Sequence, residues 1–265
     1  MTKLQTLTAD LLACLRFYSR LPVPVLSFEK EPHKMLDFSS SIRMLPFAGA
    51  LIGGVSAAVL LGALLVGLGP HIAAVLAIGA GAIATGAFHE DGLADTADSF
   101  GGMTVDRKLD IMRDSRIGTF GGMALVLSTA VKIFALAGIA QFSWALAACV
   151  LISGAAITRV LALMPLSMLN PARTDGVAYS AMQPGPEALR FAQFASAGFL
   201  ILPLLAGAEI GRILFATLLI VLMAYAITFK AKQLLGGHTG DVAGATQQVT
   251  EILFWLVFAA GRFSV

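Results

Sequence analysis

Charged residues are scarce in this 265-residue chain. Asp, Glu, Lys and Arg together make up only 13% of it, against roughly 25% in soluble domains. Hydrophobic residues make up 57%, and the mean hydropathy is +0.84. A soluble protein of this length would leave much of that apolar surface with nothing to pack on. The composition therefore excludes a soluble globular domain and indicates an integral membrane protein.

Cysteine is also scarce, and long basic tracts are missing. Cys14 and Cys149 are the two cysteines of the sequence. Both fall in apolar or amphipathic segments, so a disulfide framework is not indicated. No basic tract or aromatic–basic pattern suggests a nucleic acid partner. The first 20 residues have interspersed charges and no adequate apolar core, so a cleavable signal peptide is not expected.

Long apolar runs, by contrast, are abundant. A transmembrane helix needs about 20 apolar residues, and the 27 glycines suit helices that approach one another closely in a membrane. We therefore predict an all-α fold, a polytopic membrane bundle of six to seven transmembrane helices. The segment nearest the C-terminus is the weakest because it is short and contains Glu251. The seven segments are 44–68, 72–88, 120–140, 144–166, 189–206, 210–229 and 246–260.

An amphipathic helix is predicted ahead of the first span. Residues 1–20 carry apolar side chains near 3.6-residue spacing, and Pro22 and Pro24 end the pattern. We expect residues 1–43 to form a cytoplasmic amphipathic helix and surface segment. Residues 44–265 are then the transmembrane catalytic domain.

The distribution of basic residues predicts the orientation. They gather before the first span and in every second connection after it, whereas the alternate connections are short and almost uncharged. By the positive-inside rule, the N-terminus and the long loops face the cytoplasm. Two cations, Lys132 and Arg159, fall inside apolar spans, so each needs a partner or a water-filled cavity.

Acidic residues are few, but they cluster at one place. Positions 89–98 hold four of the 16 Asp and Glu residues of the chain. Asp91, Asp95 and Asp98 have i, i+4, i+7 spacing and would form one acidic stripe on a helix. The stripe repels itself unless a cation bridges it, and oxygen ligands suit Mg²⁺, Mn²⁺ or Ca²⁺ better than zinc. The competing interpretation is a solvated helix face.

Candidate roles follow from this segment. Glu90, Asp91 and Asp95 are the candidate catalytic residues, and with Asp98 they are also candidate metal ligands. Gly92 lies within the stripe, where it costs helix stability by ~1 kcal/mol relative to alanine. Its presence suggests close approach of a ligand or another backbone. His89 is as well explained as a helix-end residue as by a role as ligand or base.

A second polar segment spans residues 113–121. It brings two arginines and an acid to the start of the third span and is followed by glycines. Arginine binds phosphate oxygens bidentately, and backbone N–H groups at a helix start bind anions. The segment therefore resembles a phosphate cradle. The residues just before it, Asp106 and Asp110, are explained equally well by ion pairs on a surface helix. Asp114 is a further candidate metal ligand; the candidate substrate-binding residues here are Arg113, Ser115, Arg116 and Gly118.

Two further loops carry candidate binding residues. Residues 235–245, at the start of the last span, are rich in glycine and include a His and an Asp; an ordinary loop with Asp241 as a helix cap is the alternative. Residues 170–176 form an expected turn. No Walker A motif occurs. The candidate substrate-binding residues are Arg173, Gly237, His238, Thr239, Gly240 and Asp241.

Taken together, these segments resemble the cobalamin synthase family, also described as adenosylcobinamide-GDP ribazoletransferase or cobalamin 5′-phosphate synthase. The resemblance runs nearly the whole chain, and its most specific blocks are His-Glu-Asp-Gly-Leu-Ala-Asp-Thr-Ala-Asp and Arg-Asp-Ser-Arg-Ile-Gly-Thr-Phe-Gly. The matching segments are 20–24, 45–54, 89–98, 113–121 and 237–245.

This resemblance implies a multi-pass enzyme of the bacterial inner membrane that uses Mg²⁺. Its substrates would be adenosylcobinamide-GDP and α-ribazole or its 5′-phosphate. GMP would leave, and adenosylcobalamin or its 5′-phosphate would form. Membrane lipid is an expected partner, as is a second copy of the chain or another late enzyme of cobalamin synthesis. The residues suggest that acids hold Mg²⁺, with one of them as base, while arginines and loop amides hold the diphosphate.

Two alternative functions stay open, another membrane enzyme and a transporter. The first is a CDP-alcohol phosphotransferase. The Asp-Gly pair at 91–92 and the Gly-Asp-Asp spacing at 102, 106 and 110 fit its signature, but the Asp-Thr pair at 95–96 replaces Ala-Arg and the glycine comes three residues early. The second is an ion transporter, which would carry acids near the bilayer midplane of several spans. Here the acids cluster at one membrane face, which favours an enzyme.

Overall fold

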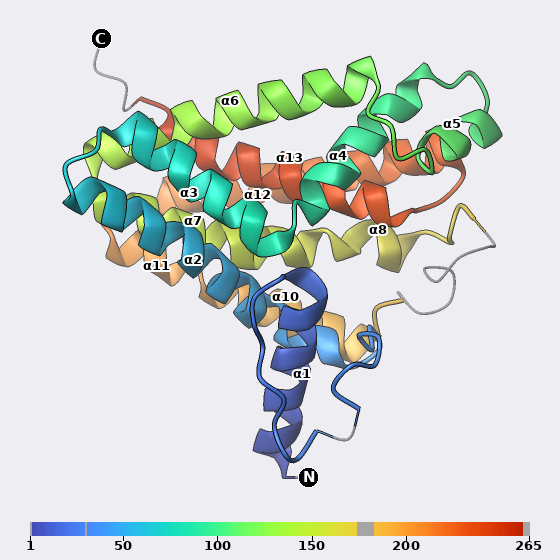
Figure 1. Ribbon diagram of the computed structural model, residues 1–265, viewed down its shortest axis with the longest axis horizontal. Coiled ribbons are helices and arrows are strands. Elements are labelled where there is room, and N and C mark those ends of the chain that lie inside the picture. The colour runs from blue at the N-terminus through green and yellow to red at the C-terminus, as the bar shows by residue number, and fades with distance from the viewer. Residues whose placement is uncertain (1, 30, 174–182, 262–265) are drawn as a thin grey trace.

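The computed structural model describes residues 2–29, 31–173 and 183–261, and these ranges are helical with a single isolated β-bridge (Figure 1). The α-helices are α1 (Lys3–Tyr18), α2 (Leu45–Leu65), α3 (Pro70–Thr85), α4 (Phe88–Asp98), α5 (Val105–Ile111), α6 (Thr119–Phe142), α7 (Trp144–Leu161), α8 (Leu163–Met168), α10 (Pro186–Gly198), α11 (Ile201–Leu205), α12 (Ile210–Leu235) and α13 (Gly240–Ala259). Two 3₁₀ turns, η1 (Ser41–Met44) and η2 (Ser99–Gly101), complete the set.

The predicted helical membrane bundle is confirmed. Six segments are long and apolar enough to cross a membrane, and a seventh arises if the bent pair α3 and α4 counts as one span. The six segments are Ser41–Leu65, Thr119–Phe142, Trp144–Met168, Pro186–Leu205, Ile210–Leu235 and Gly240–Ala259. The weakest predicted span, 246–260, is part of a 20-residue helix whose first turns come from the expected glycine-rich loop.

The second predicted span, 72–88, is not one straight helix. The chain bends by 90° between α3 and α4, where Gly86 and Ala87 both adopt left-handed backbone angles with φ of 68° and 56°. Glycine adopts this conformation without steric cost, but alanine does not. The bend is held from outside, because the Arg20 N–H donates to the Ala84 carbonyl at 2.7 Å.

Helices α7 and α13 form the interior of the bundle, and α12 lies at its periphery. The apolar stretches of α7 and α13 are 83% and 78% buried, whereas that of α12 is only 22% buried. Helix α2 packs closely on α7. A Cβ on Gly49 would lie 2.6 Å from the Ala155 carbonyl oxygen, and a Cβ on Gly53 would be nearly as close to α7. Small residues allow this approach, as is typical of membrane helices.

The N-terminal segment shares a core with the bundle. Cys14, Tyr18 and Phe38 are buried in one apolar cluster together with residues of α2, α7 and α10. The Asp10 carboxylate, also buried, accepts hydrogen bonds from Ser41 and Arg43. In Figure 1, α1 runs across the direction of the long helices. Its end therefore braces the α3–α4 bend.

The two ends of the bundle differ. Helices α4 and α5 and the start of α13 lie at one end, whereas the C-terminal end of α13 lies at the other (Figure 1). The connection between α6 and α7 is a single residue, Ser143. The polar segments singled out in the sequence therefore gather at one end of the molecule.

Candidate active site

The acidic segment is a helix, α4, that crosses α13 at very close range. The crossing point is Gly92, where an added Cβ would lie 2.8 Å from the Asp241 carbonyl oxygen and 3.1 Å from the Gly244 Cα. Gly244 meets Gly92 and His89 from the other side. The expected close approach at Gly92 is thus to another backbone, and it sets the spacing between α4 and the start of α13.

This crossing brings the acids of two helices together. Asp91 and Asp95 lie one turn apart on α4, and Asp241 lies in the first turn of α13. The carboxylates of Asp241, Asp91 and Asp98 all repel that of Asp95. Carboxylates that repel one another favour a bound cation, because the positive charge offsets theirs. Asp241 was predicted as a substrate-binding residue, and its position makes it a candidate metal ligand as well.

Arg173 supplies positive charge to the same place. Its guanidinium lies 4.0 Å from the Asp241 carboxylate and donates to the Leu109 carbonyl at the end of α5 at 3.0 Å. Its Nε is buried and has no hydrogen-bond partner among the described residues. The arginine therefore retains a donor at the edge of the acidic group.

The two predicted binding loops pair with each other. The His238 N–H donates to the Asn170 carbonyl at 3.0 Å, and the Ala172 N–H donates to the His238 carbonyl at 2.9 Å. A Cβ on Gly237 would clash with the Asn170 carbonyl oxygen, so this position requires glycine. The pairing fixes the chain just before Arg173 against the loop that leads into α13.

The remaining residues of that loop have distinct places. The Thr239 hydroxyl caps α13 by accepting from the Val242 N–H at 3.2 Å, so Thr239 and not Asp241 is the cap. Gly240 faces open space. The His238 ring is buried with neither nitrogen paired among the described residues. Burial lowers the pKa of His238, because the charged imidazolium loses its hydration there.

Asp98 points to the next helix. Its carboxylate accepts hydrogen bonds from the N–H groups of Gly118 and Gly121, both at 2.8 Å. It therefore caps the start of α6, where a negative charge meets the positive end of the helix dipole. The amides expected to cradle phosphate are partly occupied by this carboxylate. A Cβ on either glycine would overlap the Asp98 carboxylate, so a larger residue at either position would displace that side chain.

Glu90 points into the bundle and away from the acidic face. Its Oε1 accepts from the Gln248 side chain at 3.1 Å, and its Oε2 is buried without a partner among the described residues. Residues 90 and 91 lie about 100° apart around a helix, which explains why their side chains diverge. Glu90 and Asp91 thus occupy different environments on α4.

The loop before α6 is exposed. Asp114 pairs with Arg116 at 2.6 Å, and hydrogen bonds from Arg116 lower the pKa of the Asp114 carboxyl to about 2. Ser115 is exposed between them, and the Arg113 amide donates to the Asp110 carbonyl at 3.1 Å. This loop contacts α4 through Gly118, so it lies at the same end of the bundle as the acidic face.

The described residues hold no cluster of three or more His, Cys, Asp or Glu side chains already arranged as a metal site. Mg²⁺ does not require such a cage. It usually keeps several waters and binds one or two carboxylates together with substrate phosphates. Asp91, Asp95 and Asp241 supply hard oxygen donors of this kind, and they repel one another. The donor set therefore fits Mg²⁺ in its chemistry.

One group of polar residues was not assigned from the sequence. Lys132 was expected to need a partner, and it pairs with Glu251 at 2.7 Å inside the bundle. Gln247 and Gln248 join the same group. The only feature of the sequence that pointed to Gln247 and Gln248 was that they are polar residues within an apolar span. The same is true of Glu251, which made the last span appear weak.

The fold and site together define a class: an all-helical, multi-pass membrane protein with carboxylates and an arginine grouped at one end of its bundle. Residues 10–259 match the model of the cobalamin-5-phosphate synthase family. The chain belongs to this family.

Curated relatives agree over nearly the full length. Each is named adenosylcobinamide-GDP ribazoletransferase. The protein of Azorhizobium caulinodans is 44% identical over 247 residues, covering 93% of both chains. That of Rhizobium etli is 43% identical over 254 residues, covering 94% of this chain and 96% of its own. That of Xanthobacter autotrophicus is 42% identical, covering 96% and 97%. No solved structure matches the chain.

Proposed function

We propose that this protein joins adenosylcobinamide-GDP to α-ribazole or its 5′-phosphate, with release of GMP, in a reaction that depends on Mg²⁺. The observation that carries the proposal is the grouping of Asp91, Asp95, Asp241 and Arg173 in a chain similar throughout to relatives named for that reaction. The comparisons do not favour the CDP-alcohol phosphotransferase or the transporter.

The bond changes of the reaction define what the site must do. The ribazole hydroxyl oxygen bonds to the phosphorus linked to cobinamide, the bond from that phosphorus to the bridging oxygen breaks, and GMP departs with the electron pair. The hydroxyl proton passes to a carboxylate on α4. Asp91, Asp95 and Asp241 would hold Mg²⁺, which when bound neutralises charge on the diphosphate.

Charged side chains around this group would orient the diphosphate. The buried Nε of Arg173, beside Asp241, has no hydrogen-bond partner among the described residues, and guanidinium groups bind phosphate oxygens in a fixed geometry. The exposed Arg113 and Arg116 lie in the loop joined to α4 through Asp98 and Gly118. They would contact the more distant GMP portion of the substrate.

The location of this site at one end of the bundle bears on the orientation of the protein in the membrane. We propose that the protein lies in the bacterial inner membrane with the acidic face and the N-terminus in the cytoplasm. The basic connections of the sequence support this orientation. Association with a second copy or with other late enzymes of cobalamin synthesis stays a prediction.

The test is turnover of purified protein in lipid nanodiscs. We expect Asp91→Asn and Asp95→Asn each to reduce Mg²⁺-dependent GMP release by at least about 100-fold, since each removes a charge next to the reacting phosphates. Glu209→Gln is the matched control. It makes the same change at the start of α12, remote from α4, and should leave turnover unchanged. Wild-type turnover in both aspartate variants would contradict the assignment.

A further inference from the structure

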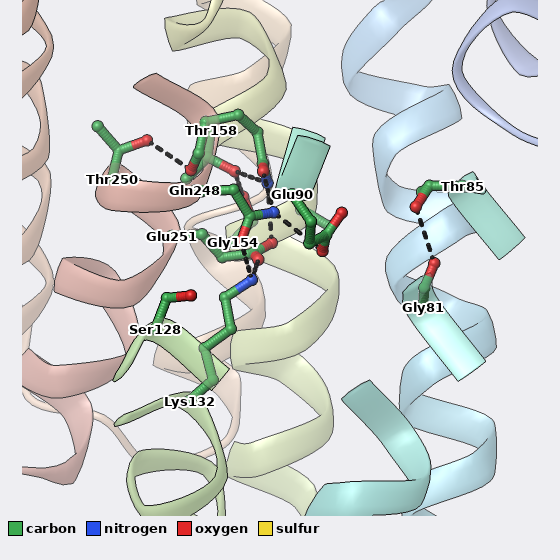
Figure 2. Close-up of polar contacts among 12 residues, drawn as sticks. Gly81, Thr85, Glu90, Ser128, Lys132, Gly154, Thr158, Gln248, Thr250 and Glu251 are labelled. Atoms are coloured by element: carbon green, nitrogen blue, oxygen red, sulfur yellow. Dashed lines mark hydrogen bonds and ion pairs between the residues drawn. The ribbon is translucent and has the colours of Figure 1, made fainter. Parts of the chain in front are cut away.

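A second polar cluster lies inside the bundle. Lys132 of α6 donates hydrogen bonds to the Glu251 carboxylate and to the Gln248 side-chain oxygen, both at 2.7 Å (Figure 2). All three residues are at least nine-tenths buried. The ammonium also lies 5.4 Å from the centre of the Trp255 ring. The Lys132 ammonium, a charge within an apolar span, therefore has an ion-pair partner, a hydrogen-bond partner and an aromatic ring beside it.

The cluster continues to α4. The Gln248 amide donates to Glu90 Oε1 at 3.1 Å (Figure 2) and to Gln247 Oε1 at 2.8 Å. The Gln247 amide in turn donates to Glu251 and to the Thr158 hydroxyl of α7, both at 3.1 Å. One hydrogen-bond network thus joins α6, α7 and α13 to Glu90, whose side chain points inward from α4.

This hydrogen-bond network borders a cavity of about 50 Å³ between α2, α3, α4, α6, α7 and α13. Four buried polar atoms of its lining residues have no hydrogen-bond partner among the described residues. These atoms are Glu90 Oε2, His89 Nε2, Arg159 Nε and Trp255 Nε1. The residues His89, Arg159 and Trp255 are 2%, 5% and 3% exposed. They come from three different helices.

The size and charge of the cavity indicate what it holds. Unpaired polar groups are costly in a bilayer interior. The cavity volume of about 50 Å³ exceeds the roughly 10–15 Å³ that a single ordered water needs, so it has room for one or more water molecules. Its charges balance, because Lys132 and Arg159 face Glu90 and Glu251. A neutral ligand with both donors and acceptors therefore fits better than an ion.

We propose that this cavity is an internal hydration site. Its water molecules, together with the hydrogen bonds of Lys132 and Gln248, hold Glu90 on the inward side of α4 and so position this helix, whose acidic face carries Asp91 and Asp95. Gln248 holds one Glu90 oxygen, and water bridges the other to Arg159 or His89. Lys132 and Gln248 are positioning residues, since they act on the reaction through Glu90 and the helix α4 that also carries Asp91 and Asp95. The positioning role rests on the proposed transferase function, but the hydration does not.

The hydration is tested without turnover. A structure of the protein in nanodiscs, at a resolution that shows ordered water, should place water within hydrogen-bond distance of Glu90 Oε2 and Arg159 Nε. Ala82→Val adds volume at the cavity lining and should displace part of it. Gly79→Val adds volume on α3 where nothing lies nearby and should not. A dry cavity in the wild-type protein would overturn the proposal.

The positioning role is tested by Gln248→Met, which keeps the volume but removes the bonds to Lys132 and Glu90. We expect kcat to fall about tenfold while KM for both substrates stays within about twofold, because the orientation of the α4 carboxylates and not ground-state binding is lost. Thr250→Val is the matched control on α13. Among the described residues its hydroxyl donates to the carbonyl groups of Thr246 and Gln247 in its own helix, so kcat should not change.

The possible failures can be told apart. If wild-type protein releases no GMP, the proposed function fails and takes the positioning role with it. If wild-type protein is active and Gln248→Met has the same kcat, only the positioning role fails. A fall in thermal stability without a change in kcat would show that the cluster is purely structural, and that result also contradicts the positioning role.

Discussion

The contact between α4 and α13 gives a sharp quantitative prediction for Gly92→Ala. The added Cβ would lie 2.8 Å from the Asp241 carbonyl oxygen, about 0.6 Å short of the 3.4 Å at which ordinary van der Waals contact begins. The Gly244 Cα, 3.1 Å away, closes the other direction. Both obstacles are backbone atoms of one helix, so α4 itself must move.

The free energy of unfolding should change little while activity changes much. Overpacking of this kind costs about 1–3 kcal/mol, and alanine returns about 1 kcal/mol through its higher helix propensity. The net destabilisation is then about 0–2 kcal/mol. A displacement of α4 carries Asp91 and Asp95 away from Asp241, and a misplacement of about 1 Å can cost about 100-fold in rate. We expect kcat to fall by at least about tenfold.

The assay combines thermal unfolding with GMP release by the protein in nanodiscs. Gly79→Ala is the matched control, because it makes the same change within α3 where, apart from the adjacent backbone of α3 itself, no atom of the described residues lies within 4 Å of the new Cβ. It should raise stability by up to about 1 kcal/mol and leave kcat unchanged. If Gly92→Ala had wild-type kcat, the spacing of α4 and α13 would not matter to the reaction, and our account of the crossing would be refuted.

Three further predictions concern stability. Asp98→Ala removes both hydrogen bonds to the start of α6 and should destabilise the protein by about 1–2 kcal/mol, whether or not Mg²⁺ is present. Thermal unfolding measures this, and a melting temperature equal to that of the wild type would contradict the capping role. Burial lowers the pKa of His238 below its unfolded value, so stability present at pH 8 should decline as pH falls through about 6.5, by at most about 1.4 kcal/mol per pH unit. His238→Gln should flatten that part of the curve of melting temperature against pH, and a curve identical to that of the wild type would contradict the role of His238. Lys132→Met leaves Glu251 uncompensated and should cost about 3–5 kcal/mol, whereas adding Glu251→Gln should recover much of that loss; a double variant as unstable as the single one would argue against the pairing.

Local sequence patterns predicted much of this fold. Apolar runs of spanning length located the helices of the bundle, since membrane thickness fixes the length a span needs. The i, i+4 spacing of Asp91 and Asp95 predicted a shared helix face, which α4 provides. The glycine at position 92 correctly indicated close approach of a backbone. In each case, the signal lies within a few residues of the feature it predicts.

Features set by distant contacts were not predictable. The apolar run of 72–88 continues through Gly86, and the bend there depends on Arg20, which donates to Ala84 from a remote part of the chain. Lys132 and Glu251 are 119 residues apart, so no periodicity links them. Asp98 belongs to the acidic stripe by spacing, but it faces the glycines at the start of α6. These differences arise from tertiary packing.

The most direct test of the central claim is the stoichiometry of the proposed reaction. Wild-type protein in nanodiscs, given adenosylcobinamide-GDP and α-ribazole, should form one GMP for each adenosylcobalamin. Both products should require Mg²⁺ and should be lost together in Asp95→Asn. Release of GMP without a corrinoid product, or equal yields of both products in the presence of a chelator, would contradict the account.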